Sequence, residues 1–284
     1  MNTISRLYSR ALIELKNSYG EEEIRFLCTV IFREVFRYTK VDIHLRKHDP
    51  LEEGGVNKFL EIIAGLKEGR PFQYVMGETE FAGKRFRVNE ETLIPRPETE
   101  ELVEWIRASG GVKEGERLLD IGTGSGCIAI VLAGWFPGGK VQGVDISAEA
   151  LRVASENARL NGVRVDLLER DILHHDAWEW PVYNVIVSNP PYVRLSERAM
   201  MHERVVAHEP HRALFVPDQD PLLFYRVIAG FGQHHLAAGG RLFFEINEAM
   251  GAEATRLLEG MGYGEIEVRQ DLFGKERMIR CVWK

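Results

Sequence analysis

The regular alternation of strand-like and helix-like segments after residue 112 constrains the fold more than any other feature of this sequence. Short apolar runs alternate with segments whose apolar residues recur at helical spacing. This alternation predicts an α/β fold with a doubly wound, mainly parallel sheet of seven strands. The last two strands have no helix between them, so we expect them to pair antiparallel through Phe273-Gly274. The predicted strands are 117–121, 140–144, 163–168, 182–187, 241–246, 265–269 and 278–283, and the predicted helices are 128–135, 148–160, 222–231 and 249–259.

The first part of the chain, residues 1–70, shows helical periodicity and indicates a small N-terminal helical bundle. Its pattern suggests no catalytic site, so we expect this domain to support folding or to recognise a partner. Residues 71–97 are expected to form a linker that contains a short hairpin, turning at Ala82-Gly83. The second domain is then expected at 98–284.

Length and composition limit the classes of protein to consider. A chain of 284 residues has room for two ordinary domains. Its net charge of −7 argues against a protein that binds nucleic-acid phosphates, which usually has a basic surface. The three cysteines form no Cys-x-x-Cys pair, so we expect a reducing compartment and no bound metal. No apolar stretch resembles a signal peptide or a membrane span, so we expect a cytoplasmic protein without membrane contact.

The loop Ser188-Asn189-Pro190-Pro191-Tyr192 follows the predicted buried strand 182–187. Two prolines stop the strand and hold the loop extended at the carboxyl end of the sheet, where open α/β sheets bind ligands. The Asn189 side-chain oxygen and the Pro190 carbonyl are two acceptors, which suit the two hydrogens of an –NH2 group. Tyr192 adds an aromatic face. We interpret the loop as a cradle for a planar –NH2, of an amide or of a nucleobase, in preference to a simple strand-ending turn.

A glycine-rich loop, Asp120-Ile121-Gly122-Thr123-Gly124-Ser125-Gly126, lies between the first strand and first helix of the second domain. Its glycines allow a tight turn and a close approach to a ligand. The spacing is not the G-x-G-x-x-G of dinucleotide binders. Asp145 ends the second strand, where a carboxylate can accept both hydroxyls of a ribose. Asp171 follows the third strand and is either a contact of an adenine or a solvated turn residue.

Three other groups of residues leave alternatives open. The segment Ile94-Pro95-Arg96-Pro97-Glu98-Thr99-Glu100 is either a plain linker or a stiff arm across the pocket of the second domain. Glu245, at the end of a predicted strand, either contacts that arm at Arg96 or forms a structural ion pair. His174-His175-Asp176 and His208-x-x-His211 have no third ligand at suitable spacing, which favours solvated loops over a metal site.

Taken together, the glycine loop, Asp145 and the Asn-Pro-Pro-Tyr loop resemble the class I S-adenosylmethionine-dependent methyltransferases, whose fold is Rossmann-like. From about residue 70 to the end, the chain more closely resembles the peptide chain release factor glutamine N5-methyltransferases. The motifs that carry this resemblance are Gln73-Tyr74-Val75-x-Gly77-Glu78, Ile94–Glu100, Asp120–Gly126, Asn189–Tyr192, Glu209-Pro210, Ala213-Leu214-Phe215, Phe224-Tyr225-Arg226, Phe244-Glu245-Ile246 and Asp271-Leu272-x-Gly274.

The resemblance implies methyl transfer from S-adenosylmethionine to a glutamine side-chain amide in the Gly-Gly-Gln loop of release factors, which would be the protein partners. It implies that Asn189, Pro190 and Tyr192 carry catalysis and that Pro191 joins them in binding substrate. The implied cofactor-binding residues are Gly122, Thr123, Gly124, Ser125, Gly126, Asp145, Asp171, Ile172 and Asn189. No metal is implied. Two departures from the family pattern, at 216–221 and at Asn247, concern the shape of loops near the site.

Four other functions are considered. A nucleic-acid methyltransferase acting on an exocyclic amine of adenine or guanine could use the same cradle, and a ribosomal-protein glutamine methyltransferase shares the plan. The net charge and the lack of an added basic domain argue against the nucleic-acid enzyme. A nicotinamide-dependent dehydrogenase would need the G-x-G-x-x-G spacing. An inactive interaction protein would have no need of the intact cradle and glycine loop.

Overall fold

The computed structural model describes residues 2–284, and the chain divides into two compact units between Met76 and Gly77. The first unit is helical and consists of α1 (Ile4–Leu15), α2 (Glu21–Phe36), α3 (Lys40–Leu45), α4 (Glu53–Lys67) and α5 (Phe72–Met76). The apolar faces predicted from the sequence form a single core that includes Leu7, Ile31 and Phe59. Helix α3 was not predicted; it begins where the Thr39 hydroxyl and the Asp42 carboxylate cap each other's backbone N–H.

The predicted hairpin is present but belongs to the second unit. Strands β1 (Glu78–Phe81) and β2 (Lys84–Arg87) pair antiparallel, and Ala82 and Gly83 turn the chain with φ of 48° and 70°. Phe81 and Phe86 pack edge to face within the core of this unit. The structure therefore places the boundary between units ahead of the hairpin, whereas the sequence suggested a separate linker over 71–97.

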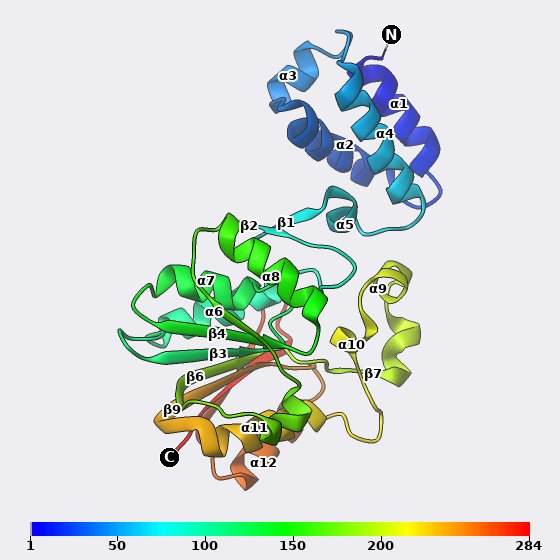
Figure 1. Cartoon of the computed structure of the whole chain (residues 1–284). Helices are drawn as coiled ribbons and strands as arrows, with labels where there is room; N and C mark the ends of the chain where they lie inside the picture. The colour runs from blue at the N-terminus through cyan, green and yellow to red at the C-terminus, as the bar shows by residue number, and fades with distance from the viewer. Residues whose placement is uncertain (1) are drawn as a thin grey trace. The chain divides into compact units, whose positions relative to one another are not determined.

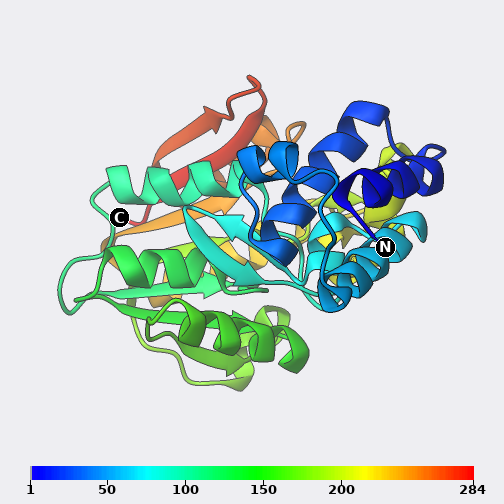
Figure 2. The same ribbon diagram turned by 90° about the horizontal axis from the view of Figure 1, so that it is seen from above.

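The second unit contains the predicted seven-stranded sheet, in the order β10-β11-β9-β6-β3-β4-β5 (Figures 1 and 2). Its neighbouring strands are parallel from β9 to β5, while β10 and β11 form the expected antiparallel pair at one edge. The strands are β3 (Arg117–Ile121), β4 (Lys140–Asp145), β5 (Asp166–Glu169), β6 (Tyr183–Ser188), β9 (Leu236–Glu245), β10 (Gly264–Gln270) and β11 (Glu276–Val282).

Helices cover both faces of this sheet (Figure 1). On one face, α6 (Pro97–Ala108), α7 (Cys127–Trp135) and α8 (Ala148–Leu160) share a core with the strands. On the other face, α11 (Leu223–His235) and α12 (Gly251–Gly260) pack around Ile186, Tyr225 and Phe244. The doubly wound architecture is thus confirmed.

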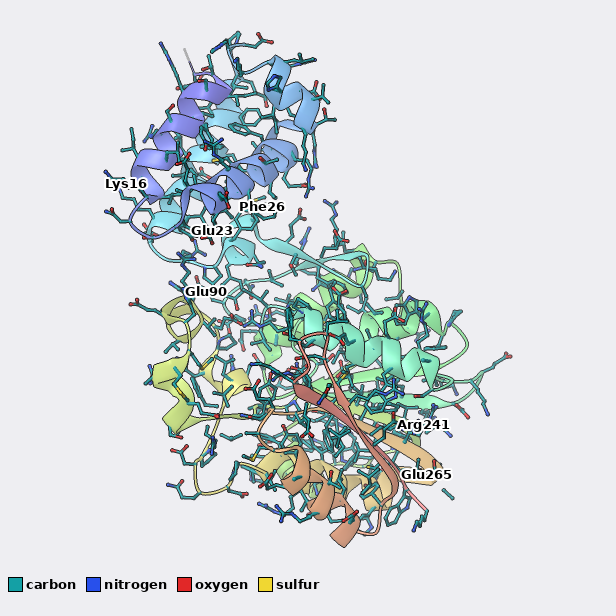
Figure 3. All side chains as sticks on the ribbon, turned by 180° about the vertical axis from the view of Figure 1, so that it is seen from behind. Lys16, Glu23, Phe26, Glu90, Arg241 and Glu265 are labelled. Carbon is teal, nitrogen blue, oxygen red and sulfur yellow. The ribbon has the colours of Figure 1, made fainter. Side chains whose placement is uncertain are left out.

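The largest differences from the prediction in the second unit concern β9 and the segment 193–216, while α11 extends to His235, four residues past its predicted end, and β5 begins at Asp166, three residues late. Strand β9 begins at Leu236, five residues before the predicted start, and its register against β6 shifts between Tyr183 and Val185. Arg241 of β9, labelled in Figure 3, donates to the carbonyls of Ser109 and Gly111 after α6. The segment 193–216, for which no element was predicted, contains β7 (Val193–Arg194), η2 (Leu195–Met200), α9 (Glu203–His208), α10 (His211–Leu214) and β8 (Phe215–Val216).

Within residues 2–284, no helix has both the length and the apolar character that crossing a membrane requires. Cys28, Cys127 and Cys281 are all buried and free of disulfides.

Candidate active site

A cavity of about 230 Å³ lies where β3, β4 and β6 end, at the carboxyl edge of the parallel strands. The glycine loop, Asp145 and the loop after β6 line it, and so do residues of the segments 91–99 and 210–213. Most of the residues singled out in the sequence are therefore brought together. Gly126 and Tyr192 are not among the lining residues of this cavity.

The backbone of the glycine loop is left-handed at each of its glycines. Gly122, Gly124 and Gly126 have φ of 73°, 55° and 80°, a region that strains residues with a Cβ. Gly122 and Gly124 line the cavity, whereas Gly126 precedes α7 and packs closely against Ile130 and Ala154. The loop therefore turns around the cavity through its first two glycines and enters the helix through the third.

Asp120, the last acid before these glycines, holds the loop in shape. Its carboxylate accepts hydrogen bonds from the Thr123 hydroxyl at 2.6 Å and from the Ala129 N–H at 3.2 Å. Burial raises the pKa of Asp120 to about 7, against the lowering effect of these two donors. No role for Asp120 was predicted from the sequence, although an acid directly before a glycine loop was a signal that could have indicated one.

Asp145 lies at the end of β4 with its carboxylate beside the cavity. Its two oxygens accept from the backbone N–H groups of Gly124 and Ser147, both at 2.9 Å. Burial raises its pKa, while these backbone donors lower it. Asp145 therefore links the glycine loop to the start of α8 and still borders the cavity.

Asp171 and Ile172 also line the cavity, after β5. Asp171 caps the short helix η1 (Ile172–Ala177), accepting from Leu173 N–H at 2.9 Å and contacting His174 Nδ1 at 2.8 Å. Ile172 is buried. Asp171 thus combines a turn-capping contact with a place at the cavity.

The Asn-Pro-Pro loop continues directly from β6. Ser188, its last strand residue, donates to the Ile121 carbonyl at 2.7 Å, and Asn189, Pro190 and Pro191 line the cavity. The Asn189 side-chain nitrogen donates to Thr99 Oγ1 at 3.2 Å. Within residues 2–284, neither Asn189 Oδ1 nor the Pro190 carbonyl oxygen accepts a hydrogen bond. The structure therefore leaves two acceptors available on this loop.

Tyr192 turns to Glu245 and packs against the core on the α11 side of the sheet. Its hydroxyl donates to Glu245 Oε1 at 3.0 Å, and the Thr99 hydroxyl donates to the other carboxylate oxygen at 2.6 Å. Glu245 therefore does contact the segment 94–100, but its partner there is Thr99 and not the predicted Arg96. The aromatic face predicted for ligand contact does not line the cavity.

The segment 94–100 forms part of the second unit, and its residues from Pro97 onward are the first turn of α6. Pro95, Arg96 and Thr99 line the cavity. The Arg96 guanidinium pairs with the buried Glu209 carboxylate at 2.5 Å, and the Ile94 N–H donates to the same carboxylate at 3.3 Å. The interpretation of this segment as an arm at the pocket is therefore correct. Glu209 belongs to the Glu209-Pro210 motif, but its pairing with Arg96 was not predicted.

The two departures from the family pattern form local contacts. Asn247 donates to the Tyr192 carbonyl at 3.2 Å and to Glu197 at 3.1 Å, which ties the end of β9 to the loop. In the 216–221 stretch, Asp218 accepts from the Ser196 N–H at 3.0 Å. Both departures thus fasten the segment that follows the Asn-Pro-Pro-Tyr loop.

The histidine pairs make ordinary local contacts. His174 contacts Asp171, His175 contacts Asp176 at 3.2 Å, and His211 contacts the Val206 carbonyl at 2.7 Å. Among the described residues 2–284, no three His, Cys, Asp or Glu side chains are grouped as a metal site would require.

The sheet order and the cavity at its carboxyl edge define a class I methyltransferase fold. Solved structures share it: a methyltransferase from Pyrococcus furiosus has a TM-score of 0.52 at 17% identity, over 71% of this chain and 89% of that one. A 16S rRNA N2 methyltransferase from T. thermophilus, solved with AdoMet and guanosine, has a TM-score of 0.52 at 18% identity, over 73% of this chain and 50% of that one. At these identities the likeness concerns the fold alone.

Sequence comparison narrows the class to one family. Residues 98–214 match the model of the methyltransferase small domain, and residues 7–77 match that of the PrmC N-terminal domain. A release factor glutamine methyltransferase of Flavobacterium psychrophilum is 42% identical over 269 residues, 94% of each chain. One of Bacteroides thetaiotaomicron is 42% identical over 282 residues, 98% of this chain and 99% of that one. The chain belongs to the release factor glutamine methyltransferase family.

Proposed function

We propose that this protein transfers a methyl group from S-adenosylmethionine to the side-chain amide nitrogen of the glutamine in the Gly-Gly-Gln loop of peptide chain release factors. The observation that carries the proposal is the pair of unpaired acceptors, Asn189 Oδ1 and the Pro190 carbonyl, beside a cavity lined by a glycine loop. The relatives' name, release factor glutamine methyltransferase, supports the substrate. The free, buried cysteines suit the reducing cytoplasm, where we place the reaction.

The residues around the cavity fit S-adenosylmethionine. The open backbone at Gly122 and Gly124 leaves room for the methionine part, because neither position has an atom closer than 3.9 Å to a Cβ built there. Asp145 would offer carboxylate oxygens to the ribose, and Asp171 and Ile172, which also line the cavity, would hold the adenine. When bound, this cofactor supplies an electrophilic methyl group on a sulfonium. Thr123, Ser125 and Asn189 complete the lining on the methionine side, while Gly126 supports the loop from the start of α7.

The chain's part in the chemistry is to hold the substrate amide. An amide nitrogen is a poor nucleophile because its lone pair is shared with the carbonyl. Asn189 Oδ1 and the Pro190 carbonyl each accept one N–H of the glutamine, which leaves the lone pair directed at the methyl group. Alignment of this kind corresponds to effective molarities of about 10⁵–10⁸ M in favourable models. The same acceptors stabilise the positive charge that develops on nitrogen, so the proton can leave after transfer without a general base.

Tyr192 and Pro191 support this cradle. Pro191 lines the cavity next to the acceptors, so it is placed for contact with the glutamine side chain. Tyr192 contributes through its hydroxyl, which anchors the loop on Glu245. This role differs from stacking on the amide plane.

The N-terminal unit is proposed to recognise the protein substrate. In residues 1–76, Lys and Arg slightly outnumber Asp and Glu, although the whole chain has a net charge of −7. Its surface exposes Phe26 and Leu45, 66% and 74% accessible, and Phe26 is labelled on α2 in Figure 3. A hollow within the same unit is lined by the basic side chains Lys40 and Lys47. A surface with exposed apolar and basic side chains suits contact with a protein better than binding of a small molecule.

The nucleic-acid amine methyltransferase remains the second candidate, because an exocyclic amine also has two hydrogens to donate. The structural neighbour solved with guanosine has this fold. A filter assay with radiolabelled cofactor separates the candidates when release factor, ribosomal protein, DNA and RNA are compared at equal concentration. We expect label in release factor. Label in RNA or DNA alone would refute the proposal.

A further inference from the structure

We propose that Thr99 and Glu245 are positioning residues that fix which way the Asn189 amide faces, so that its oxygen and not its nitrogen points to the substrate. This inference rests on the proposed function for its meaning in catalysis. The orientation of the Asn189 side-chain amide, however, can be measured without any methyl transfer.

A continuous set of hydrogen bonds links the four residues. Tyr192 Oη donates to Glu245 Oε1 at 3.0 Å, and Thr99 Oγ1 donates to Glu245 Oε2 at 2.6 Å. Asn189 Nδ2 then donates to Thr99 Oγ1 at 3.2 Å. Thr99 and Glu245 are both almost fully buried, 2% and 1% accessible. Thr99 and Glu245 are therefore shielded from water, and the set of donors decides the orientation.

The direction of every bond follows from the carboxylate. In the structure both hydroxyls donate to Glu245, whose two carboxylate oxygens act as the acceptors. A threonine hydroxyl has one hydrogen, and Thr99 has given it to Glu245, so Thr99 can only accept from Asn189. Asn189 must then turn its –NH2 to Thr99, which leaves Oδ1 for the cavity. A flipped amide would place two oxygens together at Thr99 without a hydrogen between them.

The surroundings of Glu245 act in both directions on its ionisation. Burial raises the pKa of Glu245, and the charge of Glu98 raises it further. The hydroxyls of Thr99 and Tyr192 and the charge of Arg277 lower it. The Tyr225 hydroxyl binds the Glu245 backbone carbonyl at 3.3 Å and so does not satisfy the carboxylate. The two hydroxyls are therefore the direct side-chain donors to this group among residues 2–284.

Replacing Glu245 by Gln would remove this constraint on the hydrogen-bond directions while keeping the shape of the side chain. Its amide must present one –NH2, which donates to Thr99 or Tyr192 in place of accepting. When this –NH2 faces Thr99, the Thr99 hydroxyl is free to donate to Asn189 Oδ1 and to turn the Asn189 nitrogen toward the substrate amide. Two N–H groups facing each other cannot form the cradle.

The test compares Thr99→Val, Thr99→Ser and Glu245→Gln with the wild type, and uses Thr255→Val on α12 as a control that loses a hydroxyl outside the cavity. We expect kcat for the release factor to fall about 10- to 1,000-fold in Thr99→Val and Glu245→Gln, as on loss of one preorganised group. We expect KM and cofactor affinity to change less than about threefold and Thr99→Ser to restore most of kcat. A Thr99→Val enzyme with kcat within about twofold of wild type would overturn the inference.

A second readout is independent of activity. In ¹⁵N-labelled protein, we expect the Asn189 side-chain –NH2 to exchange slowly with solvent in the wild type and in Thr99→Ser, and rapidly in Thr99→Val. Fast exchange in the wild type would contradict the orientation. If the wild type fails to methylate release factors, the proposed function fails, but this exchange measurement still decides whether Thr99 fixes Asn189.

Discussion

Arg96 and Glu209 lie 113 positions apart, and their side chains form an ion pair of 2.5 Å in which the Glu209 carboxylate is buried. This pair joins the arm 94–100 to the segment that begins with Glu209-Pro210. Both segments line the cavity. The part of the cavity wall that these two segments form is therefore held by a contact between two parts of the chain that local sequence patterns do not connect.

Replacing Arg96 by Ala should destabilise the second unit, because it leaves the buried Glu209 carboxylate without its charged partner. We expect a loss of about 1.5–3 kcal/mol in the free energy of unfolding, measured by urea denaturation. The matched control is Arg256→Ala, which breaks the exposed pair with Glu253 and should cost less than about 0.5 kcal/mol. Equal losses in the two variants would show that the Arg96–Glu209 pair does not hold the arm.

Asp145→Ala should weaken binding of S-adenosylmethionine at least about tenfold, since the carboxylate is the proposed ribose acceptor and also holds the Gly124 N–H. Isothermal titration calorimetry measures the affinity directly. Glu149→Ala, which removes a nearby exposed acid, should leave the affinity unchanged within about twofold. An unaltered affinity in Asp145→Ala would exclude the ribose role.

The stability of the protein should depend on pH through Asp120. Burial raises its pKa from 3.8 to about 7, so the folded state binds a proton that the unfolded state has already lost. The contribution of Asp120 is therefore greatest below pH 4 and is lost progressively as the pH rises to about 7.

Asp120→Asn isolates this effect, because it keeps the shape and cannot ionise. Between pH 5 and pH 7.5, the wild-type free energy of unfolding should fall relative to that of Asp120→Asn by about 1–3 kcal/mol. Thermal unfolding across this range measures the difference. A difference that is constant with pH would mean that Asp120 is ionised throughout.

Much of the fold could be predicted because its signals are local. The segment 117–121 has the apolar residues Leu118, Leu119 and Ile121 directly before a glycine loop, and β3 has the predicted bounds. Helix α8 also matches, since Ser147 caps its start and apolar residues follow at helical spacing. The early start of β9 was missed because Ala237, Gly239 and Gly240 do not look like strand residues, and the pairing of Tyr183 with Leu236 is set by the neighbouring strand.

The sequence predicted those site residues whose own side-chain or backbone groups indicate a contact with a ligand. Asn189, Pro190 and Asp145 reach the cavity as expected. The contacts of Glu245 could not be read from spacing, because they depend on where α6 packs against the end of β9. Tyr192 was placed wrongly for a similar reason: its hydroxyl finds the buried Glu245, and this contact turns the ring toward the core.

The N-terminal unit should matter for the protein substrate and not for the cofactor. We expect Phe26→Ser combined with Leu45→Ser to raise KM for an intact release factor about three- to tenfold and to leave cofactor affinity unchanged. Because both side chains are exposed, the melting temperature should stay within about 2 °C of wild type. A KM equal to that of wild type would place the recognition surface elsewhere.

The most direct test of the proposed reaction is mass spectrometry of the release factor after incubation with the protein and S-adenosylmethionine. The account predicts one added methyl group on the glutamine of the Gly-Gly-Gln peptide, and its near-complete loss with Asn189→Ala at saturating cofactor. A release factor that stays unmodified, or a methyl group formed at the wild-type rate by Asn189→Ala, would contradict it.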